Sequence, residues 1–93
     1  MGKETTLFKS EERKSRAEIC DVLRKLADQI ESGKVTLRQG NEETVLEMPE
    51  LLELEVKAED EQKSDKDVQH SLEVELKWWD GIEAEGGGGL SLD

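Results

Sequence analysis

The 93-residue chain has one cysteine, one histidine, one proline and no tyrosine, and only 3% of its residues are aromatic. A single cysteine excludes an intrachain disulfide, which suits a reducing compartment. Cys20 and His70 together supply too few ligands for a zinc site built from these residue types. No apolar run approaches the length of a membrane span, and the first residues lack the apolar core of a signal peptide. We therefore expect a cytoplasmic protein without a membrane partner.

Motifs for nucleotide binding and catalysis are also missing. The chain contains no P-loop sequence, and the glycine run 86–89 does not lie between a strand and a helix as a dinucleotide-binding turn would. The acidic segment 59–67 lacks the spacing and the glycine of an EF-hand, so a solvated charge run is the simpler interpretation, and cation binding there stays open. We expect a protein that is not an enzyme, with no catalytic, cofactor-binding or metal-ligating residues and no cofactor.

Charge is abundant and uneven along the chain. Charged residues make up 40% of the sequence, hydrophobic residues 33%, and the net charge is −11. Residues 1–40 hold nine Lys and Arg against seven Asp and Glu, a balance of +2, whereas residues 41–93 hold four against seventeen, a balance of −13. The second half should repel nucleic acid, because phosphate binding requires cationic groups. We expect a small core and no nucleic-acid partner.

The helix signals are local and agree with one another. Ser15 and Glu18 have the spacing of a capping box, in which each side chain bonds the other residue's backbone amide. Gly33 suits the left-handed residue that ends a helix. An apolar stripe lies between these signals, and its members are Ile19, Leu23, Leu26, Ala27 and Ile30. The sequence predicts a helix over residues 16–32, with Cys20 as a buried structural thiol.

Alternation with a period of two predicts strands elsewhere. Strands are expected at 35–38, at 43–48 and from about 51 to 58, and another from Val68 through the tryptophans. A β-prone segment at residues 5–9 is a candidate edge strand, and residues 39–41 are expected to form a turn. Pro49 should end the strand before it, because proline has no amide to donate to a neighbouring strand. The charged segment 59–66 is predicted to be a solvated, mobile loop. The predicted fold is α+β, with one N-terminal amphipathic helix on one face of a four- or five-stranded antiparallel sheet. We expect the domain to span residues 5–80, between a disordered stretch at 1–4 and a flexible, acidic, glycine-rich tail at 81–93.

Charge also predicts how the two long strands pair. An antiparallel register with Glu55 opposite Lys77 and Lys57 opposite Glu75 pairs unlike charges. A slip by two residues sets Glu55 opposite Glu75, which costs a few tenths of a kcal/mol, roughly. We therefore predict the first register. The predicted core comprises Ile19, Leu23, Leu26, Ile30, Val35, Leu37, Leu46, Leu54, Val56, Leu72, Val74, Leu76 and Trp78.

The order of these motifs resembles a known family, the amphi-Trp domain. The resemblance covers about Thr6 to Trp79, and Trp78 occupies the position of the tryptophan that ends the family's amphipathic strand. Trp79 and the glycine-rich tail lie outside the pattern. The resemblance implies an α+β fold and a cytosolic setting, but it carries over no reaction, cofactor or catalytic residue. The segments that match are Leu7-Phe8-Lys9, Ser15-Arg16-Ala17-Glu18-Ile19, Leu26-Ala27-Asp28, Gly33, Leu54-Glu55-Val56 and Leu72-Glu73-Val74-Glu75-Leu76-Lys77-Trp78.

The functional hypothesis is based on the two tryptophans. The alternation of side chains along a strand assigns Trp78 to the buried face and Trp79 to the exposed face. An exposed tryptophan beside an edge strand suits a binding anchor, because tryptophan is enriched at interface hot spots. The leading hypothesis is a small, non-enzymatic interaction module that contacts an unknown protein partner or forms a homodimer through the sheet edge near Trp79. The alternative is a small ligand-binding protein or enzyme that uses a helix–sheet cleft near His70.

Overall fold

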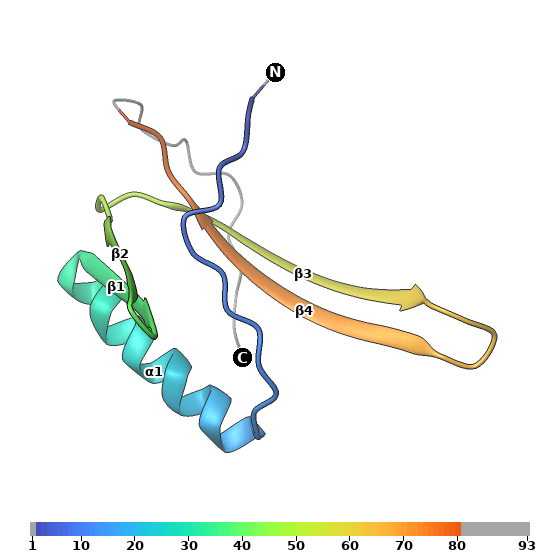
Figure 1. Ribbon diagram of the computed structural model, residues 1–93. Helices are drawn as coiled ribbons and strands as arrows, with labels where there is room; N and C mark the ends of the chain where they lie inside the picture. The colour runs from blue at the N-terminus through green and yellow to red at the C-terminus, as the bar shows by residue number, and fades with distance from the viewer. Residues whose placement is uncertain (1, 81–93) are drawn as a thin grey trace. The chain divides into compact units, whose positions relative to one another are not determined.

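A computed structural model describes residues 2–80 of the chain (Figure 1). The chain divides into two compact units, Met1–Met48 and Pro49–Asp93. The class predicted from the sequence is confirmed in outline, because the described residues form one helix and antiparallel strands. In chain order the elements are α1 (Arg16–Ser32), β1 (Lys34–Gln39), β2 (Glu42–Glu47), β3 (Glu53–Gln62) and β4 (Val68–Lys77).

Helix α1 begins and ends where the sequence predicts. The Ser15 hydroxyl accepts a hydrogen bond from the Glu18 amide at 3.1 Å, and the Ser15 amide donates to Glu18 Oε1 at 3.0 Å. These two bonds satisfy amides that have no partner within the first turn. Gly33 follows the helix with φ of +87°, a conformation that costs glycine little, and its amide bonds the carbonyls of Gln29 and Ile30.

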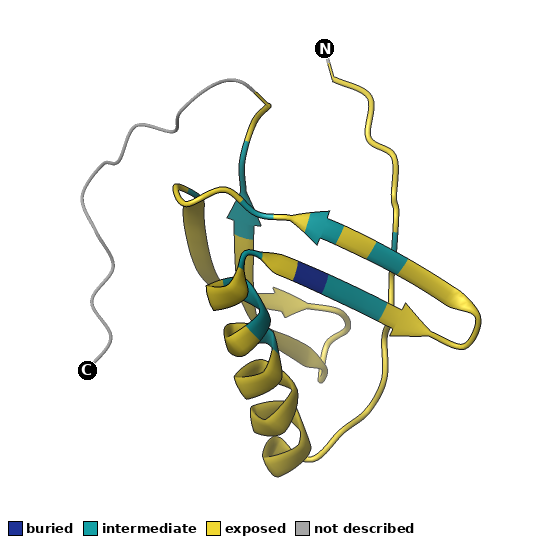
Figure 2. Ribbon diagram, turned by 90° about the vertical axis from the view of Figure 1, so that its left-hand side faces the viewer, coloured by how far each residue is buried: buried dark blue, intermediate teal, exposed yellow. Residues whose placement is uncertain are grey.

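Strands β1 and β2 form an antiparallel hairpin beside the helix. The two-residue turn between them starts with Gly40, whose φ of +58° lies in the region that favours glycine. The Gln29 side chain accepts a hydrogen bond of 2.7 Å from the Thr36 amide, which ties α1 to β1. Val35 of β1 is only 3% exposed and forms the centre of this unit (Figure 2).

Strands β3 and β4 form a second, longer hairpin in the other unit. The predicted loop at 59–66 is partly wrong, because β3 continues to Gln62. The amide of Lys63 bonds the carbonyl of Asp67 at 2.8 Å and closes the turn. The acidic composition of this segment indicates exposure to water, and an exposed face of a strand satisfies that requirement as well as a loop does.

The prediction of one four- or five-stranded sheet is wrong for the described residues, where the four strands form two separate two-stranded sheets. Alternation identifies the faces of a strand but not its neighbour, so the sequence pattern could not choose between one sheet and two. The candidate edge strand at 5–9 forms no strand. The Leu7 carbonyl instead accepts a hydrogen bond from the Thr44 hydroxyl at 3.2 Å.

The predicted core is largely wrong as well. Within residues 2–80, Val35 is the only buried hydrophobic residue, and Cys20 is exposed rather than buried. The residues of α1 that are not exposed, Leu26, Gln29 and Ile30, all lie in its C-terminal half, where Gln29 bonds Thr36 of β1, so only that half of the stripe is covered within this unit. The half-buried members of the predicted core are Leu26, Ile30, Leu37, Leu46, Leu76 and Trp78, and the exposed members are Ile19, Leu23, Leu54, Val56, Leu72 and Val74.

Residues 2–4 are exposed and belong to no helix or strand. The rest of the predicted disordered N-terminus, Met1, and the predicted flexible tail at 81–93 lie outside the described residues.

Candidate functional site on the β3–β4 hairpin

The register of β3 and β4 differs from the predicted one by two residues. Glu55 lies opposite Glu75, and Lys57 lies opposite Glu73, so the like-charge pair that we expected the fold to avoid is present. The same register pairs Leu54 with Leu76 on the other face of the ribbon. The hairpin therefore has one charged face and one apolar face.

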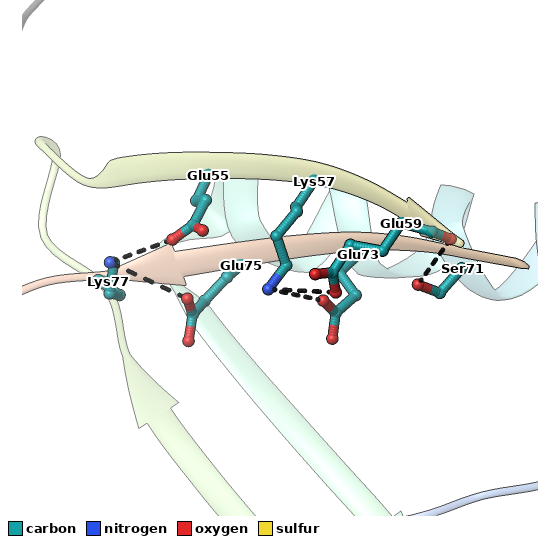
Figure 3. Close-up of polar contacts among 7 residues, drawn as sticks. All are labelled: Glu55, Lys57, Glu59, Ser71, Glu73, Glu75 and Lys77. Carbon is teal, nitrogen blue, oxygen red and sulfur yellow. Dashed lines mark hydrogen bonds and ion pairs between the residues drawn. The ribbon is translucent and has the colours of Figure 1, made fainter. Parts of the chain in front are cut away.

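One of the two lysines on this face, Lys77, explains why the like-charge pair is tolerated. Lys77 Nζ lies 3.4 Å from a carboxylate oxygen of Glu55 and 3.9 Å from one of Glu75 (Figure 3). It also lies 3.4 Å from Glu53 Oε1. Lys77 thus contacts both members of the like-charge pair. Glu75 is two residues earlier on the same strand, and Glu55 lies diagonally across on β3, within reach of a long side chain. The predicted register was chosen by comparing only the charges of residues directly opposite each other, so it did not take diagonal contacts into account.

The second lysine lies further along the same face. Lys57 Nζ is 3.4 Å from Glu73 Oε2 and 3.5 Å from Glu59 Oε1 (Figure 3). The hydrogen bond to Glu73, followed by the charge of Glu59, raises the pKa of Lys57 above its ordinary value. The hydrogen bonds to Glu53 and Glu55 likewise raise the pKa of Lys77. The neighbouring carboxylates therefore extend to higher pH the range over which both lysines are charged.

The opposite surface, the apolar hairpin face, consists of Leu54, Val56, Ala58, Leu72, Val74 and Leu76. Its members meet in three cross-strand pairs, so they form a continuous patch along the ribbon. Leu72 is 73% exposed and Val74 is 64% exposed, and of the six only Leu76 is half-buried. This face therefore presents large side chains to water, which is the unfavourable environment for them.

The two tryptophans directly follow β4, which ends at Lys77 and so is shorter than predicted. Trp78 is half-buried, whereas Trp79 is 47% exposed. Their order of exposure is the one that alternation predicts. Trp79 thus combines a large apolar ring with access to solvent, and it stays the candidate interaction residue.

His70 lies on the same face as the apolar residues, nearer the turn. Its Nδ1 is 2.6 Å from Asp60 Oδ1, and the two side chains are 74% and 69% exposed. Sequence reasoning missed Asp60 as the partner of His70, because the predicted register places Gln62 opposite the histidine. A surface depression of about 300 Å³ near this end is lined by Glu59, Asp60, Glu61, Gln69 and Ser71.

Metal ligands do not converge in the part of the chain that the structure describes. Among residues 2–80, no three His, Cys, Asp or Glu side chains lie close enough to hold an ion. Glu59 and Glu61 lie on the charged face of β3 and Asp60 on the other, so strand geometry separates neighbouring carboxylates. Within the same residues, no helix is long and apolar enough to cross a membrane.

Comparison with family models identifies the chain. The model of the amphi-Trp domain matches residues 1–93. The chain belongs to the amphi-Trp domain family. The match covers residues 1–93, so it includes Trp79 and the tail of this amphi-Trp domain, which the sequence comparison had placed outside the family's pattern. Comparison with curated proteins and with solved structures gave no match.

Proposed function

We propose that this amphi-Trp domain is a non-enzymatic, cytoplasmic interaction module whose anchor is Trp79. The observation that supports this function is the 47% exposure of Trp79 at the end of β4. Tryptophan offers a large contact area and loses little side-chain freedom on binding, which explains its frequency at hot spots. The partner is a second copy of the chain or a different protein.

The outer edge of β4 supports the same function, although the backbone of Trp79, two residues beyond this strand, forms an isolated bridge. Within the described residues, β4 pairs only with β3, so its other edge has backbone groups without a strand partner. An extended segment from a partner can add to such an edge through main-chain hydrogen bonds. The tryptophan would then supply side-chain contacts next to these main-chain bonds.

The experiment uses the Trp78→Phe variant, in which Trp79 is the remaining tryptophan. We expect iodide to quench its fluorescence readily in dilute solution. If a second copy is the partner, quenching should fall and molar mass should rise as protein concentration increases, and Trp79→Ala should abolish association while the far-ultraviolet circular dichroism spectrum is retained. Trp79→Phe serves as the matched control, because it keeps an aromatic ring at this position. Protection of Trp79 from iodide in a dilute monomer would show that it is a packing residue.

The alternative, a ligand-binding protein or enzyme near His70, has one supporting observation, the 2.6 Å contact between His70 and Asp60. Such a pair could serve acid–base chemistry if it faced a water-excluding site. Both side chains are largely exposed, however, and water competes with any polar ligand there. The interaction module is therefore the better-supported function.

A further inference from the structure

The apolar residues of β3 and β4 do not by themselves fix the register of this hairpin. Side chains alternate with a period of two, so a slip of two residues keeps every apolar side chain on its face and retains the alternation of hydrogen-bonded and non-hydrogen-bonded pairs. The structure has the apolar pairs Leu54–Leu76, Val56–Val74 and Ala58–Leu72. A slip of β4 that brings Trp78 opposite Leu54, which we name the slipped register, has Leu54–Trp78, Val56–Leu76 and Ala58–Val74. Both registers therefore contain three apolar pairs.

The charges that lie directly opposite each other are also balanced between these two registers. The structure has two unlike pairs and one like pair, which are Glu53–Lys77, Lys57–Glu73 and Glu55–Glu75. The slipped register again has two unlike pairs and one like pair, which are Glu55–Lys77, Lys57–Glu75 and Glu59–Glu73. A slip in the other direction has no unlike pair, and it sets Glu53 opposite Glu75 and Glu55 opposite Glu73. Charge therefore permits one direction of slip and opposes the other.

The turn between the strands favours the register of the structure. Residues 63–67 contain neither glycine nor proline, so no residue type there demands one turn conformation. The Ser64 hydroxyl donates to Asp67 Oδ2 at 3.0 Å and accepts from the Asp67 amide at 3.2 Å. A slip breaks these bonds and the backbone bond of Lys63, but all of them are exposed to water, which offers replacement partners. The ladder keeps its length, because residues 53–62 can pair with residues 70–79.

We propose that the β3–β4 hairpin is a two-register device, in which β4 slips by two residues along β3 and carries both tryptophans into the ladder. The register of the structure is the major state, because it retains the Ser64 turn. In the minor state Trp78 lies opposite Leu54, and Trp79 lies opposite Glu53. The device goes beyond the binding role proposed for Trp79 and does not depend on it. A partner that binds one register more tightly than the other would shift the population toward that register.

The test measures the registers by disulfide formation in the full chain carrying C20S, so that each introduced pair supplies the only thiols. V56C/V74C reports the register of the structure, V56C/L76C reports the slipped register, and V56C/L72C is the matched control for the opposite slip. In the structure the last two pairs are diagonal neighbours, about 7–8 Å apart, which is too far to bridge without movement. Each variant is equilibrated in a glutathione buffer, and mass spectrometry gives the disulfide fraction. We expect the most disulfide from V56C/V74C, and at least about threefold more from V56C/L76C than from V56C/L72C.

Two charge substitutions should shift this balance in opposite directions, which diagonal proximity alone would not produce. E59K turns the like pair of the slipped register into an unlike pair, whereas in the structure Glu59 faces Ser71. It should raise the V56C/L76C disulfide equilibrium about threefold. E75K removes the like pair of the structure and places a lysine opposite Lys57 in the slipped register, so it should lower the same equilibrium about threefold or more. The Lys57–Glu59 contact lies within β3, so its loss in E59K affects both registers alike.

Several results would overturn the inference. Equal disulfide fractions from V56C/L76C and V56C/L72C would show general opening of the hairpin, and a V56C/L76C fraction that neither charge variant changes would show diagonal proximity. Failure of V56C/V74C to form a disulfide would contradict the major state. Chemical-exchange NMR on the original chain gives a second measurement without cysteines, and β4 amides that report one register alone would also reject the device. Loss of the Trp79 binding role would leave all these measurements unchanged, so the two proposals fail separately.

Discussion

The two hairpins of this protein have the same architecture but very different burial. In β1–β2, which lies beside helix α1, Val35 is 3% exposed and Thr36 and Leu37 are half-buried. In β3–β4 every residue of β3 is exposed, and only the last two residues of β4 are half-buried, although this hairpin carries more large apolar side chains (Figure 2). The apolar content of a strand therefore does not decide its burial. Within its own unit β1–β2 has a helix beside it, whereas β3–β4 is the only hairpin among the described residues of its unit and has no helix there.

The largest expected effect is a difference in the free energy of unfolding when the same substitution, valine to alanine, is made in each of the two hairpins. Val35→Ala removes two methyl groups from the buried site and should lower the free energy of unfolding by about 2 kcal/mol. Val74→Ala makes the same change on the apolar hairpin face and should cost less than about 1 kcal/mol. Urea denaturation followed by circular dichroism measures both. Equal losses would mean that the faces of the two hairpins are covered to the same extent.

A smaller effect is expected at the start of α1. Ser15→Ala removes the cap and should cost about 1 kcal/mol, measured by the same denaturation. The backbone amide of Ser15, and then its hydroxyl, lower the pKa of Glu18 below its ordinary value of 4.5. A lowered pKa means that this contribution is present above pH 4.5 and is lost as pH falls through the folded-state value.

The pH profile of the capping box provides the control for this prediction. The helical signal of the original chain should weaken below pH 4.5, and Glu18→Gln should remove the part that comes from this carboxylate while it retains the hydroxyl cap. If the profiles of the two chains coincide throughout the acid range, the reciprocal bond does not contribute in solution.

The smallest effect is expected on the charged face of β3–β4. The raised pKa values of Lys57 and Lys77 mean that their ion pairs stabilise the hairpin below pH 10.5, and that this contribution is lost as pH rises through the folded-state values. Because these groups are exposed and screened by salt, the double variant K57M/K77M should change unfolding only slightly at pH 7. Cross-strand proton contacts followed by NMR from pH 9 to 12 should weaken in the original chain. Persistence of these contacts at the upper limit would show that the apolar pairs alone hold the register.

The success of the sequence predictions depends on how local their signals are. Helix α1 was predicted to the residue because its capping box and Gly33 act within four positions of each end. The strand register was wrong by two residues because the contacts of Lys77 cross diagonally between strands, so one lysine offsets a like-charge pair that seemed unfavourable. The contact between His70 and Asp60 was not predicted, because the same error in register places a different residue opposite His70.

The burial of the apolar residues was also predicted incorrectly. Ile19 and Leu23 belong to a regular apolar stripe, but whether such a stripe is covered depends on how many strands lie against it, which periodicity does not encode. The contrast in exposure between Trp78 and Trp79 was predicted correctly, since it needs only the alternation of an extended chain, and the role of Trp79 as an anchor stays a prediction. The family could be recognised from the order of the motifs, because that order survives errors in pairing and burial.

The bond between the Met48 amide and the Gly33 carbonyl, 2.9 Å long, joins the end of the helix to the end of β2. The bonds that connect the helix, the turn and the two strands of this unit therefore span at most fifteen positions of the chain. Closing such short loops costs little entropy, and domains built from local contacts fold on the order of microseconds to milliseconds. The first unit should accordingly be able to fold while the ribosome is still synthesising the second.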